Sequence, residues 1–280
     1  MDGLRRVFVD GAPTLVAAVR ERPHPVGATL AELLGAGRER LFAEAAAARD
    51  RPPLDRPAEL LAPVDEQEVW ASGVTYRRSA TARTGESAMP DVYELVYAAP
   101  RPELFLKATP RRVPRPGAAL RIRADSGWDV PEPELALVLD AAGAIAGFLV
   151  ADDVSSRSIE GENPLYLPQA KIYDDALGLS ETIVLATGNL GPVRRAAITL
   201  EIRRGGETAF AGATSVAEMS RSFEELAEAL YRELSHPAGA VLLTGTGVVP
   251  PDAFTLQDGD EVEIAIEGVG ALRHGIYRRS

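Results

Sequence analysis

Residues 130–157 read VPEPELALVLDAAGAIAGFLVADDVSSR, and this stretch decides which fold to expect. It contains two runs of strand length, Glu134–Leu139 and Ile145–Val150, on either side of the turn signal Ala142-Gly143. Residues 147–151 are almost wholly apolar, which indicates a buried strand. The stretch therefore predicts two strands, and acidic residues stand where the first begins and the second ends.

Those acidic residues form a candidate metal site. In Glu132-Pro133-Glu134 an extended backbone places residues i and i+2 on one face, so both carboxylates point the same way. Two such carboxylates repel unless a cation neutralises them. A third carboxylate from Asp152 or Asp153, at the end of the second run, would add an oxygen ligand and leave about three open positions on an octahedral Mg²⁺, Mn²⁺ or Ca²⁺ ion. The alternatives are a solvated strand start, and a helix cap at Asp153 or Ser155.

The chain around this stretch reads as short strands with few helices, which predicts a β-rich α+β fold. The clearest helix is expected at Phe223–Leu234, because its apolar residues recur at three- and four-residue spacing after the capping pair Ser222 and Glu225. Residues 77–90 show no periodicity and are expected to form a mobile loop. Further strands are expected at Val69–Tyr76, Leu104–Lys107, Ala119–Ile122 and 261–266, the last with apolar residues alternating with glutamate.

The first sixty residues predict a separate small unit. Arg6–Val9 is short and strand-like, Asp10-Gly11 signals a turn, and Leu30–Ala48 has the composition of a helix. Residues 51–57 contain three prolines and suit an extended connector. We therefore expect a small N-terminal α+β domain over residues 1–62 and a larger catalytic domain over residues 63–280.

Composition excludes several classes of function. The 280 residues carry a net charge of −11, which argues against a nucleic-acid groove or an anionic membrane surface as partner. The absence of cysteine excludes disulfides and thiolate chemistry, and three histidines leave carboxylates as the ligands for any metal. No apolar run reaches membrane-spanning length, and the N-terminus lacks the layout of a signal peptide, so a cytoplasmic location is expected.

Five ordered blocks over roughly residues 69–277 resemble the fumarylacetoacetate hydrolase superfamily. The blocks are P-E-x-E-L at 131–135, G-F-x-x-x-x-D-V-S-x-R at 147–157, a lysine at 171, L-L-x-G-T-G at 242–247 and L-x-x-G-D-x-V-E-I-x-I-E-G-V-G at 256–270. The resemblance implies a mixed β-roll that carries the site, after a small N-terminal domain. It also implies a homo-oligomer, either a dimer or a tetramer, and it implies residue roles: the metal ligands Glu132, Glu134 and Asp153, the active-site lysine Lys171, and Gly245 and Thr246 as contacts to a substrate carboxylate.

A finer resemblance concerns one lyase branch of that superfamily. The runs GVTYRRS at 73–79, PELFLK at 102–107 and IEGENPLYLPQAK at 159–171 resemble members that dehydrate 2-keto-3-deoxy sugar acids of the D-arabinonate or xylonate type to 2,5-dioxopentanoate. Hydrolases of the family usually have glutamine where this chain has Glu160. Their His-Glu dyad also has no counterpart here, since His24, His236 and His274 lie outside the equivalent lid.

The resemblance thus implies a small 2-keto acid substrate and a divalent ion, Mg²⁺ or else Mn²⁺ or Ca²⁺. The ion would polarise the C2 carbonyl and stabilise the enolate formed at C3. Glu103 and Lys171 would share the proton transfers, with the C4 hydroxyl as leaving group, and Arg78 and Lys107 would bind substrate. The rival readings are a metal-dependent hydrolase or decarboxylase of 2,4-dioxo or 2-oxo acids, and a protein that binds small molecules without catalysis.

Each assigned residue also has a plainer interpretation. Lys171 could be a surface lysine and Arg78 a solvated charge, because both residue types usually lie at the surface. Glu103 could pair with Lys107 across a strand end. The glycines around Thr246 could simply form a turn.

Overall fold

The computed structural model describes residues 3–20, 22–55, 58–86 and 91–279. Its largest element is an eleven-stranded sheet in which neighbours are antiparallel except for the parallel pair β16 and β5. In the order in which they lie side by side, its strands are β3 (Arg22–Pro25), β2 (Ala12–Val19), β1 (Gly3–Val9), β13 (Ile183–Leu185), β10 (Ile145–Asp153), β9 (Pro133–Leu139), β16 (Ala240–Leu243), β5 (Glu68–Ala71) and β6 (Phe105–Ala108), with β12 (Leu177–Leu179) on β10 and β4 (Glu59–Leu60) on β1.

A five-stranded sheet packs against β10 through β17 and β18. The main core lies between the two sheets, where Leu137 and Phe148 of the large sheet meet Ile264 and Leu272 of the smaller one. In order, the smaller sheet contains β15 (Glu207–Ser215), β14 (Ala197–Arg204), β17 (Glu261–Ile266), β18 (Gly270–Arg278) and β7 (Leu120–Ile122), and a separate pair is formed by β8 (Asp129–Val130) and β11 (Ser155–Ser156).

Strands β9 and β10 are buried on both faces, as the apolar runs predict. Along β9, Leu135 and Leu137 face the core between the sheets, whereas Ala136 and Val138 face a second core under the N-terminal helices. β10 runs on to Asp153, three residues beyond the predicted end. Its last two residues, Asp152 and Asp153, therefore lie within the strand, where consecutive side chains point to opposite faces.

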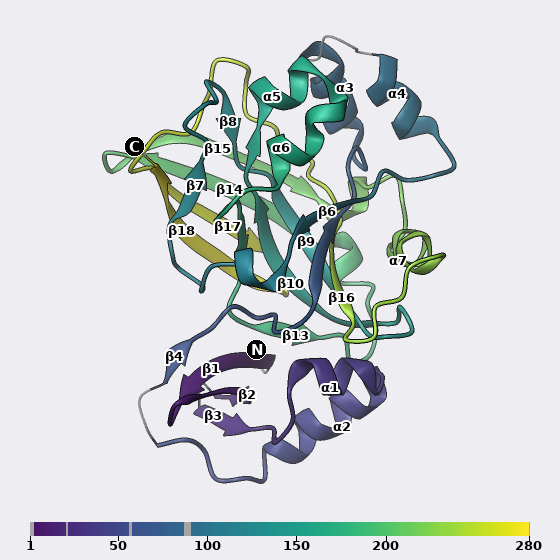
Figure 1. The fold of residues 1–280 in the computed structure, drawn as a ribbon, viewed down its shortest axis with the longest axis vertical. Helices are drawn as coiled ribbons and strands as arrows, with labels where there is room; N and C mark the ends of the chain where they lie inside the picture. The colour runs from purple at the N-terminus through teal and green to yellow at the C-terminus, as the bar shows by residue number, and fades with distance from the viewer. Residues whose placement is uncertain (1–2, 21, 56–57, 87–90, 280) are drawn as a thin grey trace.

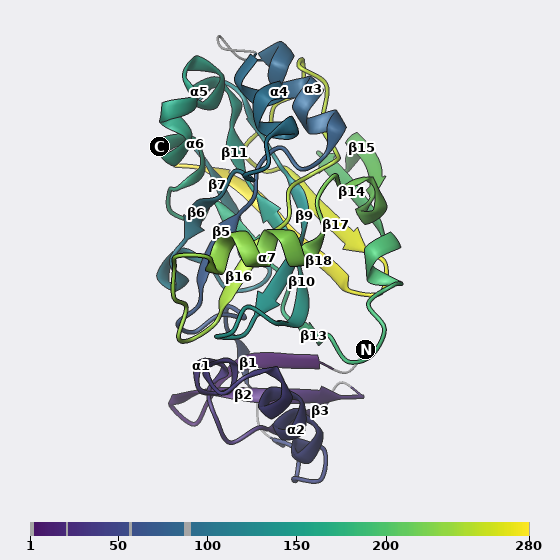
Figure 2. The same ribbon diagram turned by 90° about the vertical axis from the view of Figure 1, so that its right-hand side faces the viewer.

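The N-terminal elements are the strands β1 to β3 and the helices α1 (Leu30–Gly35) and α2 (Arg38–Ala48), which gather at the bottom of Figures 1 and 2. The single helical segment expected at Leu30–Ala48 is wrong, because Gly37, with φ at 99°, separates two helices. β1 pairs with β13 and so joins the large sheet. The division of the chain at residue 62 stays a prediction.

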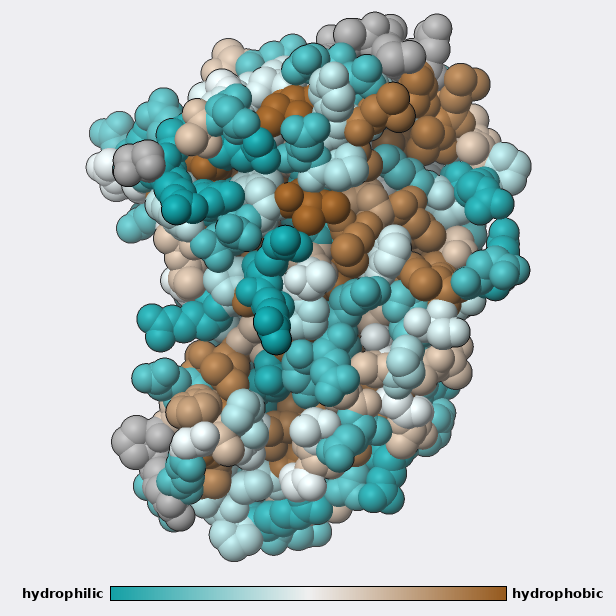
Figure 3. Space-filling view, in the orientation of Figure 1, coloured by the Kyte–Doolittle hydropathy of each residue, from teal (hydrophilic) through white to brown (hydrophobic). Residues whose placement is uncertain are grey.

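The expectation of a loop over residues 77–90 is wrong for the part that the structure describes. α3 (Arg77–Glu86) and α4 (Asp91–Ala98) form a helical pair at the top of the molecule in Figure 1, and residues 87–90 lie outside the described part. α3 shows no apolar stripe in its sequence, because Ser79 and Ala80 are the buried side chains among those described, and Ala80 packs with Val74 and Tyr93. Apolar surface is visible in this region in Figure 3, and Leu95 of α4 is 69% exposed.

The amphipathic helix of the second half is confirmed as α7 (Phe223–Tyr231), with the Ser222 hydroxyl accepting from Glu225 N–H as its cap. It ends three residues earlier than predicted and lies across the face of the large sheet in Figure 2, with Phe223 packed near Phe148. The predicted alternating strand at 261–266 is confirmed as β17. Among the described residues, no helix combines the length and apolarity needed to cross a bilayer.

Candidate active site

The three predicted carboxylates converge on one point where β9 begins and β10 ends. Pairing of these antiparallel strands sets Glu134 opposite Ala151, and the backbone N–H of Asp153 donates to the carbonyl of Glu132 at 3.0 Å. One carboxylate oxygen from each of Glu132, Glu134 and Asp153 lies within 4.8 Å of the others, and all three side chains are buried. The strand register therefore assembles the cluster that the spacing of the acids predicts.

Cationic side chains surround this cluster. Lys171 is the last residue of α6 (Leu167–Lys171), and its Nζ lies 3.0 Å from Glu132 Oε2 and 3.1 Å from Asp153 Oδ2. Arg157, the first residue of α5 (Arg157–Glu162), is 3.4 Å from Glu132 Oε1. Lys107 on β6 lies 2.5 Å from Asp153 Oδ1, and Lys171 contacts the other oxygen of that carboxylate. Buried acidic and basic side chains thus form ion pairs with one another, which lowers the desolvation cost of burying each charge.

The chain has only two lysines, Lys107 and Lys171, and arginine occupies the rest of its 30 Lys+Arg positions. Both lysines are buried, at 1% and 3% exposure, and both contact Asp153. An arginine keeps its proton in proteins, whereas a buried lysine can release one. Burial lowers the pKa of Lys107, and its carboxylate neighbour Asp153 opposes that shift. Both lysines of the chain therefore lie at this cluster, where a buried amine can release a proton and a guanidinium cannot.

Glu134 is the member of the triad whose negative charge is least stabilised by its neighbours. Burial, and then the charges of Asp153 and Glu132, hold its pKa well above the usual range of a glutamate. The backbone N–H of Gly245 donates to its Oε2, but among the described residues no cationic side chain lies within 4.0 Å of it. Lys171 and the Gly245 N–H oppose this shift in pKa only in part. Three buried carboxylates, one of them without an ion-pair partner among the described residues, suit a hard divalent cation such as Mg²⁺, so the residues present fit a metal.

Two glycines allow the walls of the site to close. Gly245 has φ at 90°, and a Cβ atom there would lie 2.1 Å from Thr75 Oγ1, so no side chain fits. A Cβ atom on Gly73 would lie 2.1 Å from Glu103 Oε2, which places the Glu103 carboxylate directly over that glycine. The cavity enclosed by these groups has a volume of only about 20 Å³. The space in front of the carboxylates is therefore narrow, about enough for one water molecule.

Most of the predicted site residues line this cavity, and two do not. Glu103, Glu132, Glu134, Asp153, Lys171, Gly245 and Thr246 all lie on its wall. Lys107 lies behind Asp153, with its ammonium also donating to the carbonyls of Val154 and Lys171. Arg78 is exposed on α3 and donates to the carbonyl of Val249 at 3.2 Å. The substrate contacts expected of Lys107 and Arg78 stay predictions.

Other wall residues were not singled out from the sequence as site residues. Ser72 follows β5, is 1% exposed, and its hydroxyl has no hydrogen-bond partner among the described residues. Glu160 is buried on α5. The sequence contained a signal for this residue, because the hydrolases of the family usually have glutamine at this position. Single serines carry no such signal, because their place at the site depends on how the chain turns after β5. The remaining wall residues are Val74, Ser79, Phe105 and Leu167.

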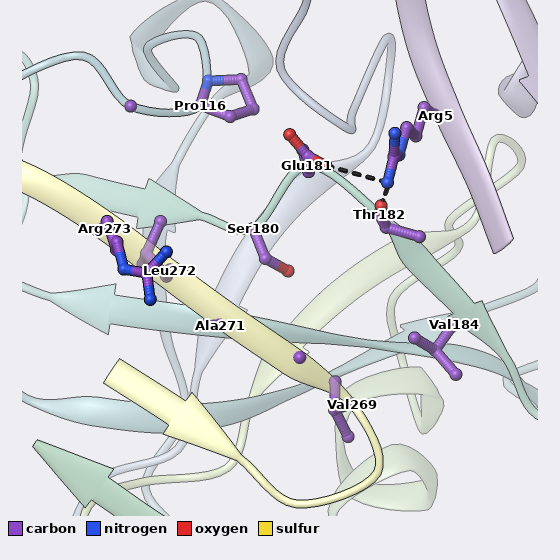
Figure 4. Close-up of a pocket in the computed structure, with 12 residues that line it drawn as sticks. Arg5, Pro116, Ser180, Glu181, Thr182, Val184, Val269, Ala271, Leu272 and Arg273 are labelled. Carbon is purple, nitrogen blue, oxygen red and sulfur yellow. Dashed lines mark hydrogen bonds and ion pairs between the residues drawn. The ribbon is translucent and has the colours of Figure 1, made fainter. Parts of the chain in front are cut away.

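A larger hollow, of about 540 Å³, lies away from this site. Figure 4 shows it between β1 and the start of β18, with Arg5 directed toward Glu181 and Thr182. Arg5 pairs with Glu181 at 2.9 Å, and Arg273 on the opposite wall pairs with Glu263 at 2.7 Å. Its charges are thus compensated within the protein, and no acidic cluster was found there among the described residues. Size alone does not mark the chemical site.

With the geometry established, residues 68–277 match the family described as fumarylacetoacetate (FAA) hydrolase, C-terminal, and the chain belongs to this family. The predicted resemblance to that superfamily is confirmed.

Two curated relatives and one solved structure are similar over most of their length. A Haloferax volcanii protein named "Probable 2-keto-3-deoxyxylonate dehydratase" is 50% identical, with 76% of this chain and 73% of the relative covered. The 2-dehydro-3-deoxy-D-arabinonate dehydratase of Saccharolobus solfataricus is 42% identical, over 78% of this chain and 74% of the relative. A structure of 2-keto-3-deoxy-D-arabinonate dehydratase complexed with magnesium and 2,5-dioxopentanoate superposes with a TM-score of 0.84 at 33% identity, covering 100% of this chain and 99% of the other.

Proposed function

We propose that this protein is a magnesium-dependent hydro-lyase that converts a 2-keto-3-deoxypentonate to 2,5-dioxopentanoate. The observation that carries the proposal is the buried triad of Glu132, Glu134 and Asp153, with the Lys171 ammonium 3.0 Å from the first and 3.1 Å from the last. The names of its similar relatives supply the substrate class, since they are dehydratases of 2-keto-3-deoxy sugar acids. The solved structure bound to magnesium and to this product adds the metal.

The triad would hold the ion, which supplies a Lewis acid that polarises the 2-oxo group and makes the C3 proton acidic. Thr246 and the Gly245 turn border the same cavity, where they can orient the substrate carboxylate. Lys171 and Glu103 also lie on this wall and are the groups placed to move protons. We assign to these two residues together the removal of the C3 proton and the protonation of the departing C4 hydroxyl.

The overall reaction conserves atoms without a further reagent. A proton leaves C3 and the hydroxyl leaves C4 as water, which creates a C3–C4 double bond next to the C2 carbonyl. A proton then moves from C5 to C3, and the resulting C4–C5 enol becomes the aldehyde when its C5 hydroxyl loses a proton and C4 takes one.

The test is turnover of each C4 epimer of 2-keto-3-deoxypentonate, with the C5 aldehyde measured through an NAD(P)-dependent aldehyde dehydrogenase. We expect aldehyde and lost substrate in equal amounts, with activity abolished by EDTA and restored by Mg²⁺. Acetylpyruvate and oxaloacetate are the parallel substrates for the hydrolase and the decarboxylase readings. Turnover of either one, with no aldehyde formed from any sugar acid, would contradict the proposal.

Gly73→Ala tests Glu103 without removing it. The new Cβ atom would lie 2.1 Å from Glu103 Oε2, so this flexible carboxylate must swing away from its place on the wall. Because positioned general acids and bases contribute about 10²- to 10⁴-fold, we expect kcat to fall at least about tenfold. Glu103→Gln should reduce kcat as well, and steady-state kinetics at saturating Mg²⁺ measure both effects.

Gly127→Ala is the matched control, because a Cβ atom there meets nothing within 4 Å. It should leave kcat and the melting temperature unchanged. If Gly73→Ala is folded and retains the full kcat of the unaltered protein, Glu103 does not act from the position that the structure gives it.

A further inference from the structure

Asp152 stands next to a metal-ligand candidate on β10 but faces the opposite side of the strand. Its carboxylate is fully buried, at 0% exposure, and each oxygen has a partner. The backbone N–H of Glu132 donates to Asp152 Oδ1 at 2.9 Å, and His274 Nε2 lies 2.9 Å from Oδ2. The strand alternation thus divides two consecutive acids between the triad and a support behind it.

His274 belongs to the other sheet. It lies on β18, which packs against β10, and its side chain is 1% exposed. A carboxylate can only accept, so a hydrogen is assigned to His274 Nε2 at this contact, while Nδ1 lies 3.1 Å from the carbonyl oxygen of Gly275. The contact therefore joins the five-stranded sheet, through one hydrogen-bonded carboxylate, to the main chain of a triad member.

The backbone of Glu132 is held on both sides by β10. Its N–H donates to the side chain of Asp152, and its carbonyl accepts from the N–H of Asp153. The first of these hydrogen bonds is made by the Asp152 side chain. The other oxygen of that carboxylate is bonded to His274. Without His274, the buried Asp152 carboxylate would have one donor fewer and would be free to rotate away from Glu132.

We propose that Asp152 and His274 are positioning residues that fix Glu132 for metal binding. The inference rests on the proposed metal site at the triad. Groups that orient metal ligands from behind typically contribute 10- to 100-fold in metal affinity. The expected effect lies in the affinity of the folded protein for the ion, and it is separate from any loss of stability.

The test is the dissociation constant for Mn²⁺, measured by titration calorimetry on folded protein, together with the melting temperature without metal. We expect His274→Phe to weaken Mn²⁺ binding about 10- to 100-fold. His274→Asn, whose amide is too short to reach Asp152, should weaken it similarly and serves if the phenylalanine variant does not fold. His274→Gln can donate to Asp152 and should bind within about threefold of the unaltered protein.

His236 offers a matched control, because it is also a buried histidine, at 5% exposure, but packs against Trp70 and Tyr231 instead of the triad. His236→Phe should leave the Mn²⁺ constant unchanged whatever it does to stability. If the unaltered protein binds Mn²⁺ and folded His274→Phe and His274→Asn bind it equally well, with only the melting temperature lowered, the positioning role is overturned. If the unaltered protein itself does not bind Mn²⁺, the proposed metal site fails instead, and the inference fails with it.

Discussion

Lys171→Arg is expected to lower kcat by about 10²- to 10⁴-fold, although it preserves the positive charge. The guanidinium does not give up its proton in proteins, so it cannot perform the proton transfer that we propose for Lys171. It is also larger, in a position where the amine is 3% exposed and touches two carboxylates. Steady-state kinetics with a 2-keto-3-deoxypentonate and saturating Mg²⁺ measure the loss.

Lys171→Met, compared with Lys171→Arg, distinguishes the effect of the positive charge from that of proton transfer. It removes the charge as well as the proton carrier, so its kcat should be as low as that of the arginine variant, while Mn²⁺ should still raise its melting temperature. Retention of more than a tenth of the normal kcat by folded Lys171→Arg would show that this side chain acts through its charge and does not carry a proton.

Glu134→Gln is expected to abolish metal-dependent activity, with a loss of about 10³-fold or more, because Lewis-acid stabilisation supplies several kcal/mol to reactions of this kind. Without metal, the variant should be at least as stable as the original protein. The reason is that a buried carboxylate repelled by Asp153 and Glu132 becomes a neutral amide, and the amide oxygen can still accept from Gly245 N–H. Thermal melts with and without Mn²⁺ measure both effects.

Glu267→Gln, on an exposed turn after β17, is the control for the same chemical change and should alter neither activity nor the response to Mn²⁺. A Glu134→Gln protein that still gains thermal stability from Mn²⁺, to the same extent as the original, would remove Glu134 from the ligand set.

The parts of the fold that the sequence predicts well are those whose patterns report burial directly. β9 and β10 are apolar on both faces because a core lies on each side of them, and α7 and β17 show the periodicities of half-buried elements. α3 was missed because its place depends on one buried alanine and on neighbours from other elements, which leave no stripe in its own residues.

The site residues also divide into those that a sequence pattern indicates and those whose place depends on the tertiary structure. The triad and Lys171 were predictable from the ordered blocks; pairing of β9 with β10 brings the triad together, and α6 places Lys171 against two of its members. The role of Asp152 was not, because deciding which of two adjacent acids faces the cavity requires knowing that β10 continues to Asp153 and which sheet covers each of its faces. The homo-oligomer, a dimer or a tetramer, stays a prediction.

The most direct test of the central claim is the position of Mn²⁺ in crystals soaked with the ion and a 2-oxo acid, located by anomalous scattering. We expect a strong peak within coordination distance, about 2.0–2.3 Å, of oxygens from Glu132, Glu134 and Asp153 at once. A protein that dehydrates its substrate but shows no peak at the triad, or binds the ion only at another place, would contradict the assignment of these carboxylates as the metal site.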